Sequence, residues 1–119
     1  MNWFDHEYLV PIILGNGKEE RTLSRVIRRA TGAIPDIFAD KFGTFQCFSV
    51  SCHRLPSENE SIIYMSICSF IDSLEEYRFP VIIYGEEFKD FVISNSDSIE
   101  EKAILCTIDE AYKMLNGDI

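Results

Sequence analysis

The chain has 119 residues, of which 46% are hydrophobic and 13% aromatic, proportions typical of a folded globular protein. A chain of this length buries about two-thirds of its unfolded surface, so we expect a single domain over residues 1–119. Twenty acidic against eleven basic side chains give a formal net charge of −9. That charge disfavours nucleic acid and anionic membrane surfaces as partners.

The sequence also predicts the environment of the protein. It contains no run of about 18 uninterrupted apolar residues, the length that a membrane-spanning helix needs. The first ten residues include Asp5, His6 and Glu7 where a signal peptide has a basic start and an apolar run. We therefore expect a cytoplasmic protein whose four cysteines are reduced and mostly directed into the core.

The first third of the chain predicts the opening of a βαβ unit. Val10–Leu14 is an apolar, mostly β-branched run that indicates a buried strand, and Gly15–Gly17 follows it as a tight turn. Apolar residues then recur at helical spacing over Lys18–Thr31, with Gly32 as a stop signal. Ala33–Ala39 is a second short apolar run, predicted to lie parallel to the first strand after a right-handed crossover.

The middle of the chain predicts a third strand and a long helix. Phe45–Val50 is rich in aromatic and β-branched residues and indicates a strand, which Ser51–Ser57 leaves as a polar exit. Apolar residues over Glu58–Arg78 follow one broad helical face. Ser57 is the predicted N-cap of this helix, and Glu60 completes a capping box with it.

The last third predicts two further strands and two helices. Pro80–Tyr84 indicates a strand, Glu86–Ser94 a brief helix, Asn95–Lys102 a polar connection and Ala103–Cys106 a fifth strand. Thr107 is the predicted cap of a final helix. Short apolar strands that alternate with helices predict a three-layer, Rossmann-like, doubly wound α/β fold with a mainly parallel sheet of four or five strands.

Three stretches in this order resemble one known pattern. They are Pro11–Gly15 followed by a helix, the strand Pro80–Ile83 leading into Glu86–Phe88, and the terminal helix that starts at Thr107–Ala111. Together they resemble the N-terminal, pre-ATP-grasp domain of carboxylate–amine ligases. In that family a much larger ATP-grasp portion follows, binds ATP and magnesium, and joins a carboxylate to an amine through an acyl phosphate.

The resemblance implies a supporting role for this chain. No residue of the ATP-grasp portion is available here to be matched, so ATP binding and ligation are not carried over. We therefore expect no cofactor and no catalysis by this chain alone, and an ATP-grasp domain in cis or in trans as its partner. In the family, the loop after the first strand faces the active-site cleft and helps to hold substrate, and Gly15, Asn16 and Gly17 match that loop.

The residues themselves point to the same loop as a candidate ligand-binding site. Gly15, Asn16 and Gly17 lie at the carboxyl end of a predicted strand, where open α/β sheets bind ligands. A simple tight turn and a small-molecule contact both remain open, whereas a dinucleotide site is disfavoured because Glu20 replaces the third glycine of the G-x-G-x-x-G pattern. Asp40 ends the second predicted strand, either as a contact to a ribose hydroxyl or as a solvated loop residue.

Other candidate groups have simpler structural explanations. The arginines of the first helix could hold a carboxylate or phosphate, or could form salt bridges with the acids around them. Cys52 and His53 are neighbours on an extended segment, so their side chains point to opposite faces and cannot form a nucleophile–base pair. Paired Cys-x-x-Cys spacing is missing, so no metal site is predicted.

The aromatic residues between Phe38 and Phe48 outnumber those that a two-sided core needs in this region. This excess predicts an exposed apolar patch that a second copy or another protein covers. A homodimer or interaction module is therefore the alternative function, and packing of these side chains into the core is the competing explanation.

Overall fold

The computed structural model describes residues 2–39, 51–55 and 59–116. Within them, five strands form one all-parallel sheet in the order β3-β2-β1-β4-β5. The strands are β1 (Leu9–Leu14), β2 (Asp36–Ala39), β3 (Ser51–Arg54), β4 (Phe79–Tyr84) and β5 (Ile104–Thr107). The helices are α1 (Lys18–Thr31), α2 (Glu60–Asp72), α3 (Lys89–Glu100) and α4 (Ile108–Leu115), with short 3₁₀ turns η1 (Trp3–Asp5) and η2 (Glu86–Phe88). The predicted three-layer, doubly wound α/β fold is confirmed.

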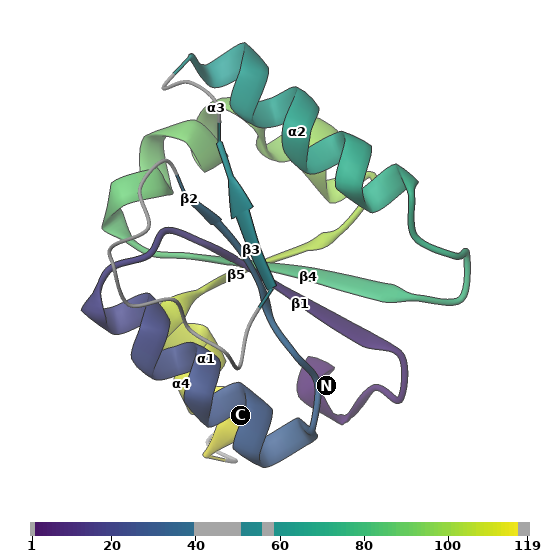
Figure 1. The fold of residues 1–119 in the computed structure, drawn as a ribbon, viewed down its shortest axis with the longest axis vertical. Helices are drawn as coiled ribbons and strands as arrows, with labels where there is room; N and C mark the ends of the chain where they lie inside the picture. Colours follow the sequence, from purple (N-terminus) through teal and green to yellow (C-terminus); the bar gives the residue numbers. More distant parts are fainter. Residues whose placement is uncertain (1, 40–50, 56–58, 117–119) are drawn as a thin grey trace.

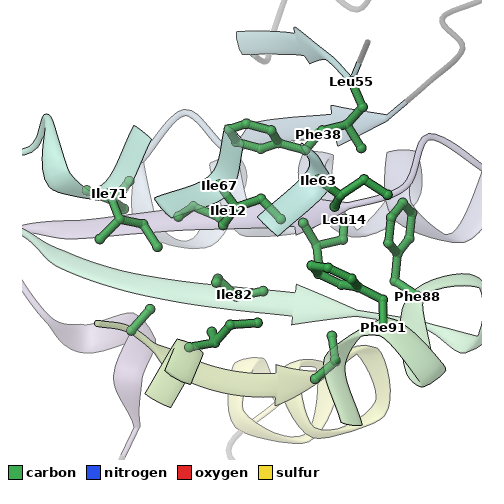
Figure 2. Packing of buried hydrophobic residues seen from close by; sticks show 14 residues of the cluster. Ile12, Leu14, Phe38, Leu55, Ile63, Ile67, Ile71, Ile82, Phe88 and Phe91 are labelled. Atoms are coloured by element: carbon green, nitrogen blue, oxygen red, sulfur yellow. The ribbon is translucent and has the colours of Figure 1, made fainter. Parts of the chain in front are cut away.

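Helices cover both faces of the sheet. In Figure 1, α2 and α3 lie together above the strands, and α1 and α4 lie together below them. Ile12 and Ile13 are neighbours on β1 and both are 0% exposed, because successive side chains of a strand point to opposite faces. Ile12 belongs to the core beneath α2 and α3, which Figure 2 shows, and Ile13 to the core above α1 and α4. A sheet buried on both sides explains why its central strands are continuous apolar runs.

The third strand differs from the prediction. Ser51–Arg54 was expected to be a polar exit, but it forms β3 and pairs in parallel with β2, from Asp36 opposite Ser51 to Ala39 opposite Arg54. Three of its four side chains are exposed, since β3 is the edge of the sheet. An edge strand needs backbone pairing and not an apolar side-chain pattern, so composition alone could not reveal it. The strand predicted over Phe45–Val50 lies outside the described residues.

The long helix is shorter than predicted. It begins with Asn59 as its N-cap, whose side chain accepts a hydrogen bond from the Ser61 amide at 2.9 Å. It ends at Asp72 and not at Arg78, because Ser73 caps it and the chain must turn there to enter β4. Ser57, the predicted cap, lies outside the described residues.

The helix after β4 is longer than predicted. Asn95–Lys102 was expected to be a polar connection, but α3 continues to Glu100. Ile99 is 1% exposed and packs in the same core as Phe91 and Val92, which holds the last turn against the sheet. The last turn of α3 contains few apolar residues, so the sequence pattern did not indicate a helix there. Ile99 is the buried residue through which this turn contacts the core. α4 is confirmed, with Thr107 as its cap.

The structure shows the environment of Phe38 and of three cysteines, for which the sequence left burial open. Phe38 is 3% exposed and packs edge-on against Phe70 of α2, so it belongs to the core and not to an exposed patch. The other phenylalanines of that stretch lie outside the described residues. Of the three described cysteines, Cys106 is buried, Cys68 is half-buried and Cys52 is exposed, whereas Cys47 lies outside the described residues. None of the described helices is long and apolar enough to cross a membrane.

The buried thiol predicts a loss of stability in alkaline solution. Burial, with a smaller contribution from Glu110, raises the pKa of Cys106 from 9.0 to about 12. The unfolded chain therefore loses this proton at lower pH than the folded chain, so the stabilisation is complete below pH 9 and is lost as the pH rises toward 12. We expect the free energy of unfolding to fall across this window, with Cys106 contributing up to about 1.4 kcal/mol per pH unit.

Urea denaturation at several alkaline pH values measures this slope. The Cys106→Ala variant is expected to show a shallower slope than the wild type. Val92→Ala, which truncates a buried side chain without removing a titratable group, serves as the control with an unchanged slope. Equal slopes in the Cys106→Ala variant and the wild type would contradict the assignment. Burial, followed by Glu19, raises the pKa of Tyr112, and this group contributes equally in all three proteins. The pKa of Tyr84 is raised by burial, by Glu110 and by Cys106 itself, so a small change in the titration of Tyr84 accompanies Cys106→Ala.

Candidate functional site at the carboxyl edge of the sheet

The loop Gly15–Gly17 connects β1 to α1 at the carboxyl edge of the sheet. Gly15 has a φ of +114°, a conformation that only glycine adopts readily, and its amide donates a hydrogen bond to the Phe38 carbonyl of β2 at 2.8 Å. A Cβ atom on Gly15 would clash with Oε1 of Glu20. The backbone conformation therefore favours glycine at this position, and an added Cβ would also displace the Glu20 carboxylate.

The side chain of Glu20 occupies the space in front of this loop. Glu20 is only 7% exposed, and its Oε2 lies 3.1 Å from the position that a Cβ on Gly17 would take. In nucleotide-binding proteins this position, at the N-terminus of the first helix, holds a phosphate. Here the chain's own carboxylate fills it, which disfavours the dinucleotide alternative.

A hollow of about 250 Å³ opens next to this loop, and we call it the carboxyl-edge hollow. It lies at the carboxyl ends of β4 and β5 and also reaches α1. β1 and β4 are neighbours in the sheet, but the helices that follow them lie on opposite faces: α1 after β1 and α3 after β4 (Figure 1). The direction in which strands are added to the sheet therefore reverses between these two strands. Ligands of open α/β folds bind at such a reversal. The lining residues are Glu19, Tyr84, Gly85, Glu86, Lys89, Ile93, Thr107, Ile108 and Asp109.

Gly85, which follows β4, lines the hollow where side chains of α1 and α4 come close to it. A Cβ on Gly85 would lie 2.9 Å from Cδ1 of Ile108, which is tighter than real contacts allow. It would also lie 3.9 Å from Oε2 of Glu19, so the Glu19 carboxylate reaches from α1 to the end of β4. Three elements that are distant in sequence therefore meet at this glycine.

The charges around the carboxyl-edge hollow are mostly negative. Glu19, Glu86 and Asp109 contribute carboxylates from three different elements, and Lys89 contributes the one ammonium group among the lining residues. Burial, followed by the nearby Glu110 carboxylate, raises the pKa of Tyr84 above its ordinary value. Such a hollow attracts a ligand with a positively charged amino group, and Lys89 can pair with a carboxylate of the same ligand.

The amide groups at the start of α4, beside the hollow, are hydrogen-bonded by side chains of the protein itself. Thr107 Oγ1 accepts a hydrogen bond from the Glu110 amide at 3.1 Å, and the Thr107 amide donates to Glu110 Oε1 at 3.2 Å. This capping box uses amide groups that could otherwise bind an external anion. α1 differs, because its N-cap Gly17 makes no side-chain cap hydrogen bond and the Glu20 carboxylate only occupies the space beside it.

No family model, curated protein or solved structure matches the chain. The functional argument therefore depends on the geometry of the site and on the residues that form it.

Gly15, Asn16 and Gly17, three of the predicted site residues, lie beside the carboxyl-edge hollow and do not line it. Gly15 is buried, Asn16 half-buried and Gly17 exposed, and the loop they form leads directly into Glu19, which does line the hollow. Asp40 lies outside the described residues. The lining groups on β4, η2 and α4 were not predicted, although they follow the carboxyl ends of strands just as the glycine loop does.

A second polar group, on the edge strand, lacks the geometry for nucleophilic catalysis. His53 Nε2 lies 2.8 Å from Asp36 Oδ1 and 3.4 Å from Ser51 Oγ. A catalytic triad uses one ring nitrogen for the acid and the other for the nucleophile, whereas here the same nitrogen faces both groups. The imidazole ring of His53 also stacks on Phe38 of β2. The stacking and the His53–Asp36 contact therefore stabilise the pairing of β3 with β2. Among the described residues, no group of three potential ligands could hold a metal ion.

Proposed function

We propose that this chain is a non-catalytic Rossmann-like domain that contacts the amino substrate of an ATP-grasp carboxylate–amine ligase system. The ATP-grasp portion, in cis or in trans, supplies ATP binding and the chemistry of ligation. The proposal combines the resemblance in the sequence with the charge and position of the carboxyl-edge hollow.

The observation that carries the proposal is the placement of three carboxylates and one ammonium group around the hollow. Glu19, Glu86 and Asp109 complement the ammonium group of an amino acid or amine, and Lys89 complements a carboxylate. The amine is the substrate that a carboxylate–amine ligase must orient for attack on an acyl phosphate. A hollow of about 250 Å³ suits a small amino acid and not a nucleotide.

The N-terminal ends of α1 and α4, at the same edge of the sheet, support a chain that does not itself bind ATP. Rossmann and P-loop folds bind nucleotide phosphates with free amide groups at a helix N-terminus, and positive charge around the phosphates favours that binding. The Glu20 carboxylate occupies the space beside the start of α1, and Glu110 takes part in the capping box at the start of α4. The acids in the hollow would repel phosphates further, so a separate ATP-binding portion fits the proposal.

Isothermal titration of the chain with a panel of amino acids, amines and small carboxylates tests the proposal. We expect at least one amino acid to bind and ATP not to bind. Glu86→Gln is expected to weaken amino-acid binding by about tenfold, because a hydrogen bond to a charged group contributes about 1.5–3 kcal/mol. Glu75→Gln, an exposed substitution between α2 and β4, is the matched control with unchanged binding.

Two results would count against the proposal. Equal weakening in both variants would place the binding elsewhere. A stable dimer that binds none of these compounds would favour the alternative, an interaction module. The observation behind this alternative is that Ile62 and Met65, three residues apart on α2, are 39% and 67% exposed. Light scattering on the titrated sample measures the oligomeric state.

A further inference from the structure

A second hollow lies at the opposite edge of the sheet, where the strands begin. It has a volume of about 350 Å³, and we call it the amino-edge hollow. Its walls come from the segments that enter β1, β2 and β4, including His6, Tyr8, Thr31 and Arg78. It is separate from the carboxyl-edge hollow and shares no lining residue with it.

Arg78 is a charged lining residue of this hollow that forms no ion pair with the described residues. Its Nε is covered by protein and has no hydrogen-bond partner, and no carboxylate of the described residues forms an ion pair with it. Among the described residues, Nε of Arg78 is the one buried side-chain nitrogen or oxygen without a hydrogen-bond partner. The two terminal guanidinium nitrogens have no partner among these residues either but are not buried, so they are accessible to solvent. A partly buried cation is costly without an anion, and the charge is shared over the whole guanidinium group. An oxyanion at the terminal nitrogens would compensate it.

His6 supplies a second donor to the same hollow. Its Nδ1 accepts a hydrogen bond from the Tyr8 amide at 3.1 Å, so in the neutral ring Nε2 carries the proton. The ring stacks on Phe79 with a centroid distance of 4.2 Å and an interplanar angle of 7°, which fixes its orientation. No described group accepts a hydrogen bond from Nε2. The structure therefore fixes a hydrogen-bond donor near the guanidinium without giving it an acceptor.

Two features of the hollow oppose an anion and limit its charge. Glu7 is an exposed lining residue, although it forms no ion pair with Arg78 or His6. The C-terminal end of α1, capped by Gly32, presents the negative end of the helix dipole. Arg28 and Arg29 in the last turn of α1 offset this end. The balance suits one compact oxyanion and not a polyphosphate.

We infer that the amino-edge hollow binds the carboxylate or phosphate group of a small molecule through the guanidinium of Arg78 and Nε2–H of His6. The exposed ring of Tyr8, which packs edge-on against Tyr77, forms an aromatic wall for the rest of that molecule. The site does not depend on the proposed function, because none of its residues contributes to the carboxyl-edge hollow.

NMR titration with acetate and, separately, with inorganic phosphate at constant pH and ionic strength tests this inference. The chain has two histidines, so the ring protons of His6 report on the site and those of His53 serve as an internal control. We expect the His6 signals to shift to saturation with at least one anion while the His53 signals stay constant. Tighter binding of acetate identifies a carboxylate site, and tighter binding of phosphate a phosphate site.

The Arg78→Gln variant is expected to bind the same anion at least about tenfold more weakly. Arg25→Gln removes an exposed arginine of α1 and is the matched control with unchanged affinity. If Arg78→Gln does not fold, Arg78→Lys keeps the charge and loses the planar fork, and it is expected to bind several-fold more weakly. No saturable His6 shift with either anion, or equal affinity in the wild type and the Arg78 variant that folds, would overturn the inference.

Discussion

Replacing Ile13 by alanine is expected to lower the free energy of unfolding by about 2–5 kcal/mol. Ile13 is 0% exposed in β1, the central strand, and packs in the core on the side of α1 and α4. The substitution removes apolar surface that is fully buried. It also leaves a cavity that a sheet paired on both sides cannot close.

Urea denaturation followed by circular dichroism measures this loss. Ile34→Ala is the matched control: Ile34 is 56% exposed in the connection between α1 and β2, so its replacement is expected to change stability by no more than about 0.5 kcal/mol. Similar losses in the two variants would contradict the central, doubly covered position of β1.

Replacing Gly15 by alanine is expected to cost about 2–4 kcal/mol, from backbone strain together with overpacking. The residue has a φ of +114°, and the added Cβ would clash with the Glu20 carboxylate. Gly32→Ala separates the two effects, because Gly32 has a φ of +77° with open space around it. That control is expected to cost about 1 kcal/mol, from strain alone.

A double-mutant cycle identifies the source of the clash. In the Gly15→Ala background, Glu20→Ala is expected to recover part of the lost stability, because it removes the atoms that the new methyl group meets. Additive losses in the cycle, or equal costs for the Gly15 and Gly32 substitutions, would show that Glu20 does not fill the loop. The same denaturation experiment measures the four proteins of the cycle and the Gly32→Ala control.

The sequence predicted the centre of the fold better than its edges. β1 and β4 are runs of apolar, β-branched residues that end at Gly15 and Gly85, and their composition alone identifies them as buried parallel strands. The edge strand β3 contains Ser51 and Arg54 and depends on backbone pairing with β2. Its side chains face solvent, so neither alternation nor an apolar run indicates it.

The candidate site could be predicted only in part. The rule that ligands bind at the carboxyl ends of strands directed attention to Gly15–Gly17. The same rule applies to Glu86 and Asp109, but their acidic side chains are also typical of solvated helix starts. That Glu19 reaches Gly85 follows from the adjacency of β1 and β4, a long-range pairing that no local pattern specifies.

The pairing of β1 with β4 also determines the order in which the molecule can be assembled during synthesis. Leu9 lies opposite Phe79 and Leu14 opposite Tyr84, so six consecutive residue pairs join β1 to β4. The ribosome synthesises β1 well before β4. A ribosome-bound chain that has completed β3 still carries one unpaired flank of its most apolar strand. Until β4 emerges, that flank is open to incorrect partners, and closure of the long intervening loop is expected to limit the folding rate.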